Sequence, residues 1–113
     1  MKINVITGLL GLTGALLLSP MASAADAASA DALAKKEGCL KCHAIDKKKE
    51  AKSLKEISKQ FAGKPDAEAK ILKQITAGGK VKLDDGTEEE HKIIKTKDKA
   101  EINNLIGWIL SLK

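Results

Sequence analysis

The sequence predicts a single all-α domain of about four short helices. Near its C-terminus, apolar residues recur three or four positions apart, which is the spacing of one helix face. These residues are Ile102, Leu105, Ile106 and Ile109. Two segments have the pattern of a helix N-terminus, a small polar or acidic residue followed three positions later by glutamate. They are Ser53-Leu54-Lys55-Glu56 and Asp98-Lys99-Ala100-Glu101. With 113 residues, the chain is long enough for one such domain and no more.

The first two helices are expected in the first half of this domain. Good helix formers occupy the segment from Asp31 to about Glu37. One face of that helix carries Ala30, Leu33 and Ala34. A second, shorter helix is expected to begin at Ser53 and to end at Gly63, because glycine commonly terminates helices. Its inward-facing side chains are Leu54, Ile57 and Phe61.

The second half is expected to hold two more helices and a long connection. Pro65 fits the first turn of the third helix, and Gly78-Gly79 stops it. Its apolar stripe is Ala67, Ile71, Leu72 and Ile75. Residues 77–97 form a polar connection, in which Asp85-Gly86 predicts a turn and allows a short extended pair. The last helix follows, with Trp108 beside its apolar stripe.

The segment Cys39-Leu40-Lys41-Cys42-His43 has the spacing of a c-type haem attachment motif. Two thiols three positions apart can each add to a haem vinyl group while the chain makes one helical turn. Cys39 and Cys42 are therefore predicted to form thioethers. The next residue, His43, then lies over the porphyrin face, where its imidazole can bind the iron as the proximal ligand. We expect one covalently attached haem c, with the helices wrapped around it.

Other interpretations of the cysteine pair are open from the sequence. A thioredoxin-like redox pair belongs in a βαβ setting, which this sequence does not show. A structural zinc ion needs four ligands, and only His91 remains as a fourth soft donor. A disulfide between Cys39 and Cys42 is a third interpretation, and it leaves His43 without a role.

The first 24 residues have the pattern of a secretory signal peptide. A basic start precedes an apolar run over residues 3–18, Pro20 ends the run, and Ala22-Ser23-Ala24 offers the small side chains that a signal peptidase reads. We expect cleavage after Ala24, leaving residues 25–113 as the haem domain in the periplasm, where bacterial c-type haem is attached. Ala28-Ser29-Ala30 is a second candidate cut, and an uncleaved membrane anchor is the alternative.

Charge and composition narrow the expected partners. Twenty lysines and no arginine give a net charge of +5. No arginine-rich run or aromatic platform is present to bind phosphates or bases, so nucleic acid is not an expected partner. Lysines suit brief, salt-sensitive encounters, and we expect redox partner proteins with acidic docking patches. The alternative is a merely solvated surface, because fifteen acidic residues are interspersed with the lysines. With only Phe61 and Trp108 as aromatic residues, the porphyrin itself is expected to supply much of the core.

The order of these features resembles the small bacterial class I cytochromes c over essentially the whole predicted mature chain. That order is a helix, the Cys-x-x-Cys-His motif, two middle helices, a ligand loop and a last helix that contains tryptophan. Local matches are Cys42-His43-Ala44-Ile45-Asp46, Phe61-Ala62-Gly63, Asp66-Ala67-Glu68-Ala69 and Gly107-Trp108-Ile109-Leu110-Ser111. The resemblance implies that the first and last helices cross near the haem edge, with Gly38 or Ala34 against the face from Leu105 to Ile109.

The chain departs from the family pattern near the proximal ligand. Members of the family usually have a Gly-Pro pair downstream of the motif, and the proline carbonyl accepts the N–H of the proximal imidazole. The like-spaced residues here are Ala51-Lys52. The backbone carbonyl is kept but its preset geometry is not, so the sequence leaves this hydrogen bond open.

The distal ligand is a second departure. The family normally uses a methionine shortly before the last helix, whereas Met1 and Met21 both lie in the predicted signal peptide. His91 falls within one residue of that methionine position and is the only other histidine, so the resemblance implies His91 as the distal iron ligand. The alternatives are a solvent-exposed His91, ligation by Asn103, Asn104 or a lysine, and an open distal face.

Within the family, the ligand pattern, size and lysine-rich character resemble the bis-histidine monohaem periplasmic shuttle of the Mto-type iron-oxidation pathway. The resemblance implies one-electron transfer between redox partners by a monomer that has no catalytic residues. The alternative is a five-coordinate haem protein that binds or senses a small gas, with His91 unbound. A peroxidase-like enzyme is weaker still, because no distal His/Arg pair can be built without arginine.

Overall fold

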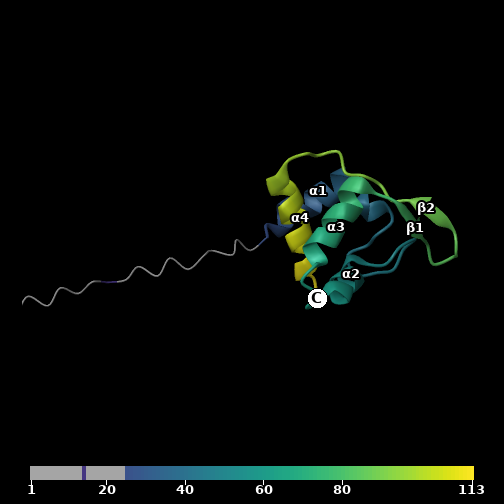
Figure 1. Cartoon of the computed structure of the whole chain (residues 1–113), viewed down its shortest axis with the longest axis horizontal. Coiled ribbons are helices and arrows are strands. Elements are labelled where there is room, and N and C mark those ends of the chain that lie inside the picture. The colour runs from purple at the N-terminus through teal and green to yellow at the C-terminus, as the bar shows by residue number, and fades with distance from the viewer. Residues whose placement is uncertain (1–13, 15–24) are drawn as a thin grey trace, which may run out of the picture.

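The computed structural model describes Gly14 and residues 25–113, so all of the predicted signal peptide except Gly14 lies outside the described residues. In this part of the chain there are four α-helices, a short 3₁₀ turn and a two-stranded hairpin, and the hairpin projects from one side of the group of helices (Figure 1). The elements are α1 (Ala27–Lys36), the 3₁₀ turn (Cys39–Lys41), α2 (Leu54–Phe61), α3 (Ala67–Ala77), β1 (Lys80–Lys82), β2 (Glu88–Glu90) and α4 (Lys99–Ser111). The expected all-α class is confirmed. None of the helices formed by these residues is long and apolar enough to cross a membrane.

Helix α4 is the centre of the packing. It contacts α1, α2 and α3, and its apolar stripe is buried as predicted. The buried residues of α4 are Ile102, Leu105, Ile106, Trp108 and Ile109. Leu105 is only 1% exposed, and removing such a side chain from water contributes about 1.5–3 kcal/mol. The core is therefore built around one helix, with the other three laid against it.

Capping side chains fix where the helices begin. Asp98 accepts from the backbone N–H groups of Ala100 and Glu101 at 2.9 and 3.2 Å, and Ser53 Oγ accepts from the N–H of Glu56 at 3.1 Å. Both predicted cap signatures are confirmed. The first helix begins at Ala27 rather than at Asp31, because Asp26 caps it through the N–H of Ser29 at 3.2 Å.

Two expectations about α3 are wrong in detail. The helix begins at Ala67, with Asp66 at its N-cap, so Pro65 precedes the first turn instead of lying in it. Leu72 is 40% exposed, whereas the other members of the predicted stripe, Ala67, Ile71 and Ile75, are buried. These three lie four positions apart and therefore share one face of the helix. Leu72 directly follows Ile71, so its side chain is rotated around the helix axis away from that face.

The polar connection after α3 contains the hairpin that the sequence allowed. Strands β1 and β2 pair antiparallel, which places Lys80 opposite Glu90 and Lys82 opposite Glu88. Opposite charges facing each other across the strands stabilise this register. Asp85 accepts from the N–H of Thr87 at 2.9 Å within the turn. Because β2 ends one residue before His91, the hairpin determines where the predicted distal ligand emerges.

The N-terminal end of the domain is tied to α4. The N–H of Asp26 donates to Asn104 Oδ1 at 2.7 Å, and Asn104 Nδ2 donates to the carbonyl of Asp26 at 3.0 Å. Ala25 approaches the same helix, since its Cβ lies 3.6 Å from the position of a Cβ added to Gly107. The described chain is thus part of the fold from its first residues after the predicted cleavage site.

We predict that the cap at α4 contributes more to stability than the residue in the equivalent position at α3. Asp98→Ala removes two side-chain hydrogen bonds at the start of the central helix and should lower the free energy of unfolding by about 1 kcal/mol. Asp66→Ala is the matched control, because Asp66 makes no cap hydrogen bond and only an exposed pair with Lys70, so its loss should be clearly smaller. Urea denaturation followed by circular dichroism measures both, and equal losses would contradict the assignment.

Candidate haem site

The Cys-x-x-Cys-His segment forms one tight turn directly after α1. The helix ends at Glu37, whose N–H donates to the carbonyl of Leu33 at 2.8 Å. Gly38 then adopts a left-handed conformation with φ of +79°, which redirects the chain and favours glycine. The N–H of His43 donates to the carbonyl of Cys39 at 3.0 Å, closing the turn. Both thiols and the imidazole are thereby held on one short piece of backbone.

Of the two residues that the resemblance offers for the contact with α4, Gly38 or Ala34, the structure selects Ala34. The atoms nearest to a Cβ added at Gly38 belong to Lys92, whose Nζ would be 3.2 Å away, and to Lys41. Ala34, the other candidate, is fully buried in the same core cluster as Leu105. The crossing of α1 and α4 therefore involves Ala34, and Gly38 faces the loop that follows β2.

The two cysteines are unpaired and half-buried, so the disulfide interpretation has no support in the structure. Burial raises the pKa of both thiols. At Cys42 the neighbouring Glu50 carboxylate, which accepts a hydrogen bond from Sγ at 3.6 Å, raises the pKa further. Both side chains are thus held as neutral thiols beside the same turn.

The orientation of His43 is set by a backbone carbonyl. Its Nδ1 lies 2.6 Å from the carbonyl oxygen of Lys52. Because a carbonyl only accepts, Nδ1 carries the proton and Nε2 keeps its lone pair for a metal. The hydrogen bond that the sequence left open is therefore present without proline. Burial also lowers the pKa of His43, which favours the neutral imidazole that can bind iron.

Backbone hydrogen bonds hold the Lys52 carbonyl in place. The N–H of Ala51 donates to the carbonyl of Cys42 at 3.1 Å, and the N–H of Leu54 donates to the carbonyl of Ala44 at 2.9 Å. Both bonds fold the segment before α2 back onto the motif. The chain thus replaces the fixed ring of proline with a loop whose two ends are anchored.

The orientation of His91 is set in the same way, by a backbone carbonyl. Its N–H donates to the carbonyl of Gly79 at 2.8 Å, which continues the pairing of the hairpin by one residue. Its Nδ1 lies 2.9 Å from the carbonyl oxygen of Lys92 and so also carries the proton. Nε2 is again the atom left for a ligand. Sequence reasoning missed the role of Lys92, because every residue has a carbonyl and none signals its direction.

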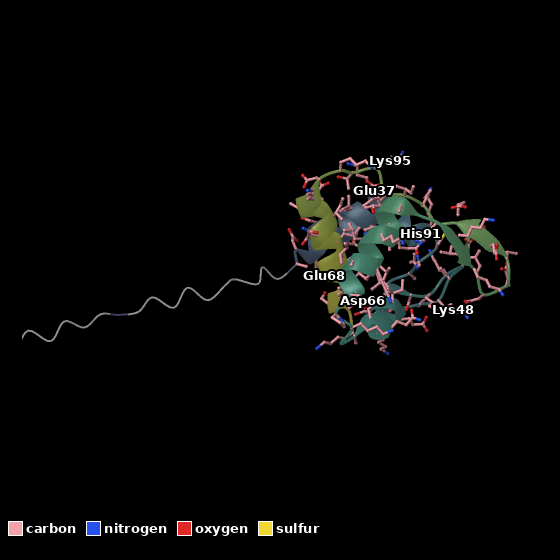
Figure 2. All side chains as sticks on the ribbon, viewed as in Figure 1. Glu37, Lys48, Asp66, Glu68, His91 and Lys95 are labelled. Atoms are coloured by element: carbon pink, nitrogen blue, oxygen red, sulfur yellow. The ribbon has the colours of Figure 1, made fainter. Side chains whose placement is uncertain are left out.

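The structure brings the imidazoles of His43 and His91, which are far apart in the sequence, close together. Their ring centroids are 6.2 Å apart and their planes are inclined at 43° (Figure 2 labels His91). Metal–imidazole bonds are about 2 Å long, so two imidazoles bound on opposite sides of one metal have centroids about 6 Å apart. The centroid distance and the donor set, two imidazoles and two free thiols, fit a covalently attached haem whose iron both imidazoles would hold.

The remaining alternatives find less support. Within residues 25–113, no group of three or more His, Cys, Asp or Glu side chains is arranged to hold a metal ion, as a structural zinc site would require. The side-chain amide of Asn104 is engaged in two hydrogen bonds with the backbone of Asp26. Two surface hollows of about 260 and 330 Å³ are lined by neither cysteine nor histidine.

Comparison with known proteins identifies the family. The cytochrome c family matches residues 27–113. Cytochrome c2 of Rhodocyclus tenuis is 36% identical over 87 residues, which cover 76% of this chain and 95% of that protein. The crystal structure of class 1 cytochrome MtoD from Sideroxydans lithotrophicus ES-1 is 47% identical with a TM-score of 0.75, covering 79% of this chain and 98% of that one. Cytochrome c552 of Nitrosomonas europaea is 29% identical with a TM-score of 0.60, covering 74% of this chain and 99% of that one.

These similarities extend over the whole described domain, from α1 through the attachment motif to α4. They confirm the class I fold and the single haem that the sequence predicted. The chain belongs to the cytochrome c family and is a haem-based electron carrier with one covalently attached haem c.

Proposed function

We propose that this protein is a periplasmic one-electron shuttle with bis-histidine ligation. In this proposal Cys39 and Cys42 form the thioethers, His43 is the proximal iron ligand and His91 is the distal one. The observation that carries it is the pair of neighbouring imidazoles with centroids 6.2 Å apart, each with Nδ1 hydrogen-bonded to a backbone carbonyl, which leaves Nε2 for the iron. The haem supplies one-electron chemistry at its iron. The chain's own residues bind and orient, and none is proposed to be catalytic.

The protein's contribution to electron transfer is to keep its donor atoms still. A backbone carbonyl holds Nδ1 of each imidazole, which fixes the orientation of both rings. His43 is on a closed turn, and His91 directly follows a paired strand. Ligands held in this way require little rearrangement between oxidation states, which favours fast exchange with partners.

Lysines near the attachment motif support the proposal that the partners have acidic docking patches. Lys49 Nζ donates to the carbonyl of Leu40 at 3.1 Å, and the side chains of Lys41 and Lys92 lie beside Gly38. Their ammonium groups place positive charge next to the proposed haem attachment. Such a surface steers an acidic partner toward the haem and releases it readily in salt. A monomer suffices for this role.

The proposal includes processing of residues 1–24 as a signal peptide. Cleavage after Ala24 keeps Asp26, which both caps α1 and exchanges two hydrogen bonds with Asn104. Cleavage after Ala30 would remove this cap and the first turn of α1. The fold therefore favours the first cut, and the domain of the mature protein is residues 25–113.

We expect the purified protein to have the mass of residues 25–113 plus one haem. The haem should stay bound after acid–acetone extraction, because thioethers survive this treatment. Cys39→Ala or Cys42→Ala should sharply lower the yield, since each removes one covalent bond to the group around which the core forms. Intact-mass spectrometry of the denatured protein measures both where the signal peptide is cleaved and whether the haem is covalently attached. Haem released intact from the wild type would contradict covalent attachment.

We expect the ferric protein at neutral pH to be low-spin and to lack the charge-transfer band of methionine ligation. It should bind carbon monoxide slowly when reduced, because His91 must leave first. His91→Ala should become high-spin or recruit a lysine, and it should bind added imidazole. His91→Met should raise the reduction potential, since a thioether donates less to ferric iron than an imidazole does. Absorption and EPR spectra measure these states.

The neighbouring residue provides the control for this experiment. Glu90 is exposed and is the last residue of β2, directly before His91, so Glu90→Gln should keep the wild-type spectrum. A wild type that is high-spin and takes up carbon monoxide promptly would show His91 to be unbound. The five-coordinate gas-binding protein would then be the better proposal.

We expect electron transfer with an anionic reagent to depend on salt. The rate constant with ferricyanide should fall several-fold between low and moderate ionic strength, because exposed charges are screened over about 8 Å at physiological salt. The triple substitution of Lys41, Lys49 and Lys92 by glutamine should lower the rate at low salt. Lys113→Gln is the control, because the C-terminus lies far from the hairpin (Figure 1). A rate indifferent to salt would mean that the lysines only solvate the surface.

A further inference from the structure

The Glu37 carboxylate joins two parts of the site that are far apart in the sequence. Its Oε2 accepts from the N–H of Lys95 at 2.7 Å, and its Oε1 accepts from the N–H of Thr96 at 3.2 Å. Glu37 is the last residue before Gly38 and the attachment motif, whereas Lys95 and Thr96 belong to the loop between His91 and α4. Figure 2 shows Glu37 beside Lys95, with His91 on the same side of the molecule. We propose that Glu37 is a positioning residue that holds His91 at the iron by fastening its loop to α1.

The loop needs such fastening because it has no regular secondary structure. Between β2 and α4, its backbone is held at separate points. Ile94 is 4% exposed, and its N–H donates to the carbonyl of Ile75 at 2.9 Å. Thr96 Oγ donates to Glu101 at 2.7 Å. The first of these anchors ties the loop to α3 and the second to α4, while Glu37 ties it to the element that carries the motif.

The charge of Glu37 makes this anchor strong. A carboxylate that accepts two backbone N–H groups forms charge-assisted hydrogen bonds, which are stronger than neutral ones. Glu37 is half-buried at this point, so water competes for these bonds less than it does at a fully exposed side chain. Removing the carboxylate leaves both N–H groups without their acceptor and should increase opening of the loop about 10- to 100-fold.

The position of Glu37 gives the anchor its functional consequence. Its own N–H completes the last turn of α1 by donating to Leu33, so its backbone is fixed by the helix. The next residues form the turn that holds both cysteines and His43. Fastening the distal loop to this point makes the two ligand-bearing segments move as one unit. The inference rests on the proposed ligation by His91 and adds that Glu37 determines how often His91 leaves the iron.

The test compares Glu37→Ala and Glu37→Gln with the wild type, all loaded with haem. Hydrogen exchange of the Lys95 and Thr96 amides, measured by NMR, reports the anchor itself. The rate at which added imidazole replaces His91 in the ferric protein reports its consequence. Both should rise about tenfold or more in Glu37→Ala. Glu37→Gln keeps one carbonyl acceptor and the side-chain volume, so it should show a smaller rise in both.

Glu68→Ala provides the control, because Glu68 is an exposed residue of α3 that lies away from this loop (Figure 2). Its amide exchange and imidazole replacement should match the wild type. If the two amides exchange at wild-type rates in Glu37→Ala, the anchor is absent and the inference fails. If they exchange faster while imidazole replacement is unchanged, Glu37 holds the loop but not the ligand, and the inference also fails. A high-spin wild type would instead overturn ligation by His91, and this inference with it.

Discussion

The burial of one face of α4 is the interaction on which the rest of the structure depends. This helix contacts all three others, and Leu105 and Trp108 are almost completely shielded from water within it. Helix α2 is joined to it by the Ser58 hydroxyl, which donates to the carbonyl of Leu110 at 2.9 Å. Because α1 leads directly into the attachment motif, its crossing with α4 also decides where the cysteines and His43 lie.

Backbone carbonyls orient both of the proposed iron ligands. Two separate loops each present one carbonyl to an imidazole Nδ1, Lys52 to His43 and Lys92 to His91. In each case the imidazole is oriented by the direction of the lysine's peptide group, and the lysine side chain takes no part in this contact. A loop closed by hydrogen bonds at both ends sets this direction as well as a proline does, although many different sequences can form such a loop.

Charged side chains serve two different purposes in this small domain. Glu37 is half-buried and bonded to two backbone N–H groups, so it acts as a structural joint. The pair between Lys48 and Asp84, at 2.9 Å, is exposed and spans the loop before α2 and the hairpin, where water and salt weaken it. An exposed pair of this kind therefore contributes little to holding the fold together.

The sequence by itself determined the features that depend on neighbouring residues. The attachment motif, the caps at Ser53 and Asp98, the α4 stripe and the turn at Asp85-Gly86 all arise from contacts within a few positions, which local patterns report. Only the tertiary structure decided that the imidazoles of His43 and His91 lie close together, that the Lys52 carbonyl replaces a proline carbonyl, and that Leu72 lies outside the core. These features depend on how distant helices pack and on which way peptide groups point. No residue type encodes either of these, because every residue carries the same backbone carbonyl and the packing is a property of the whole chain.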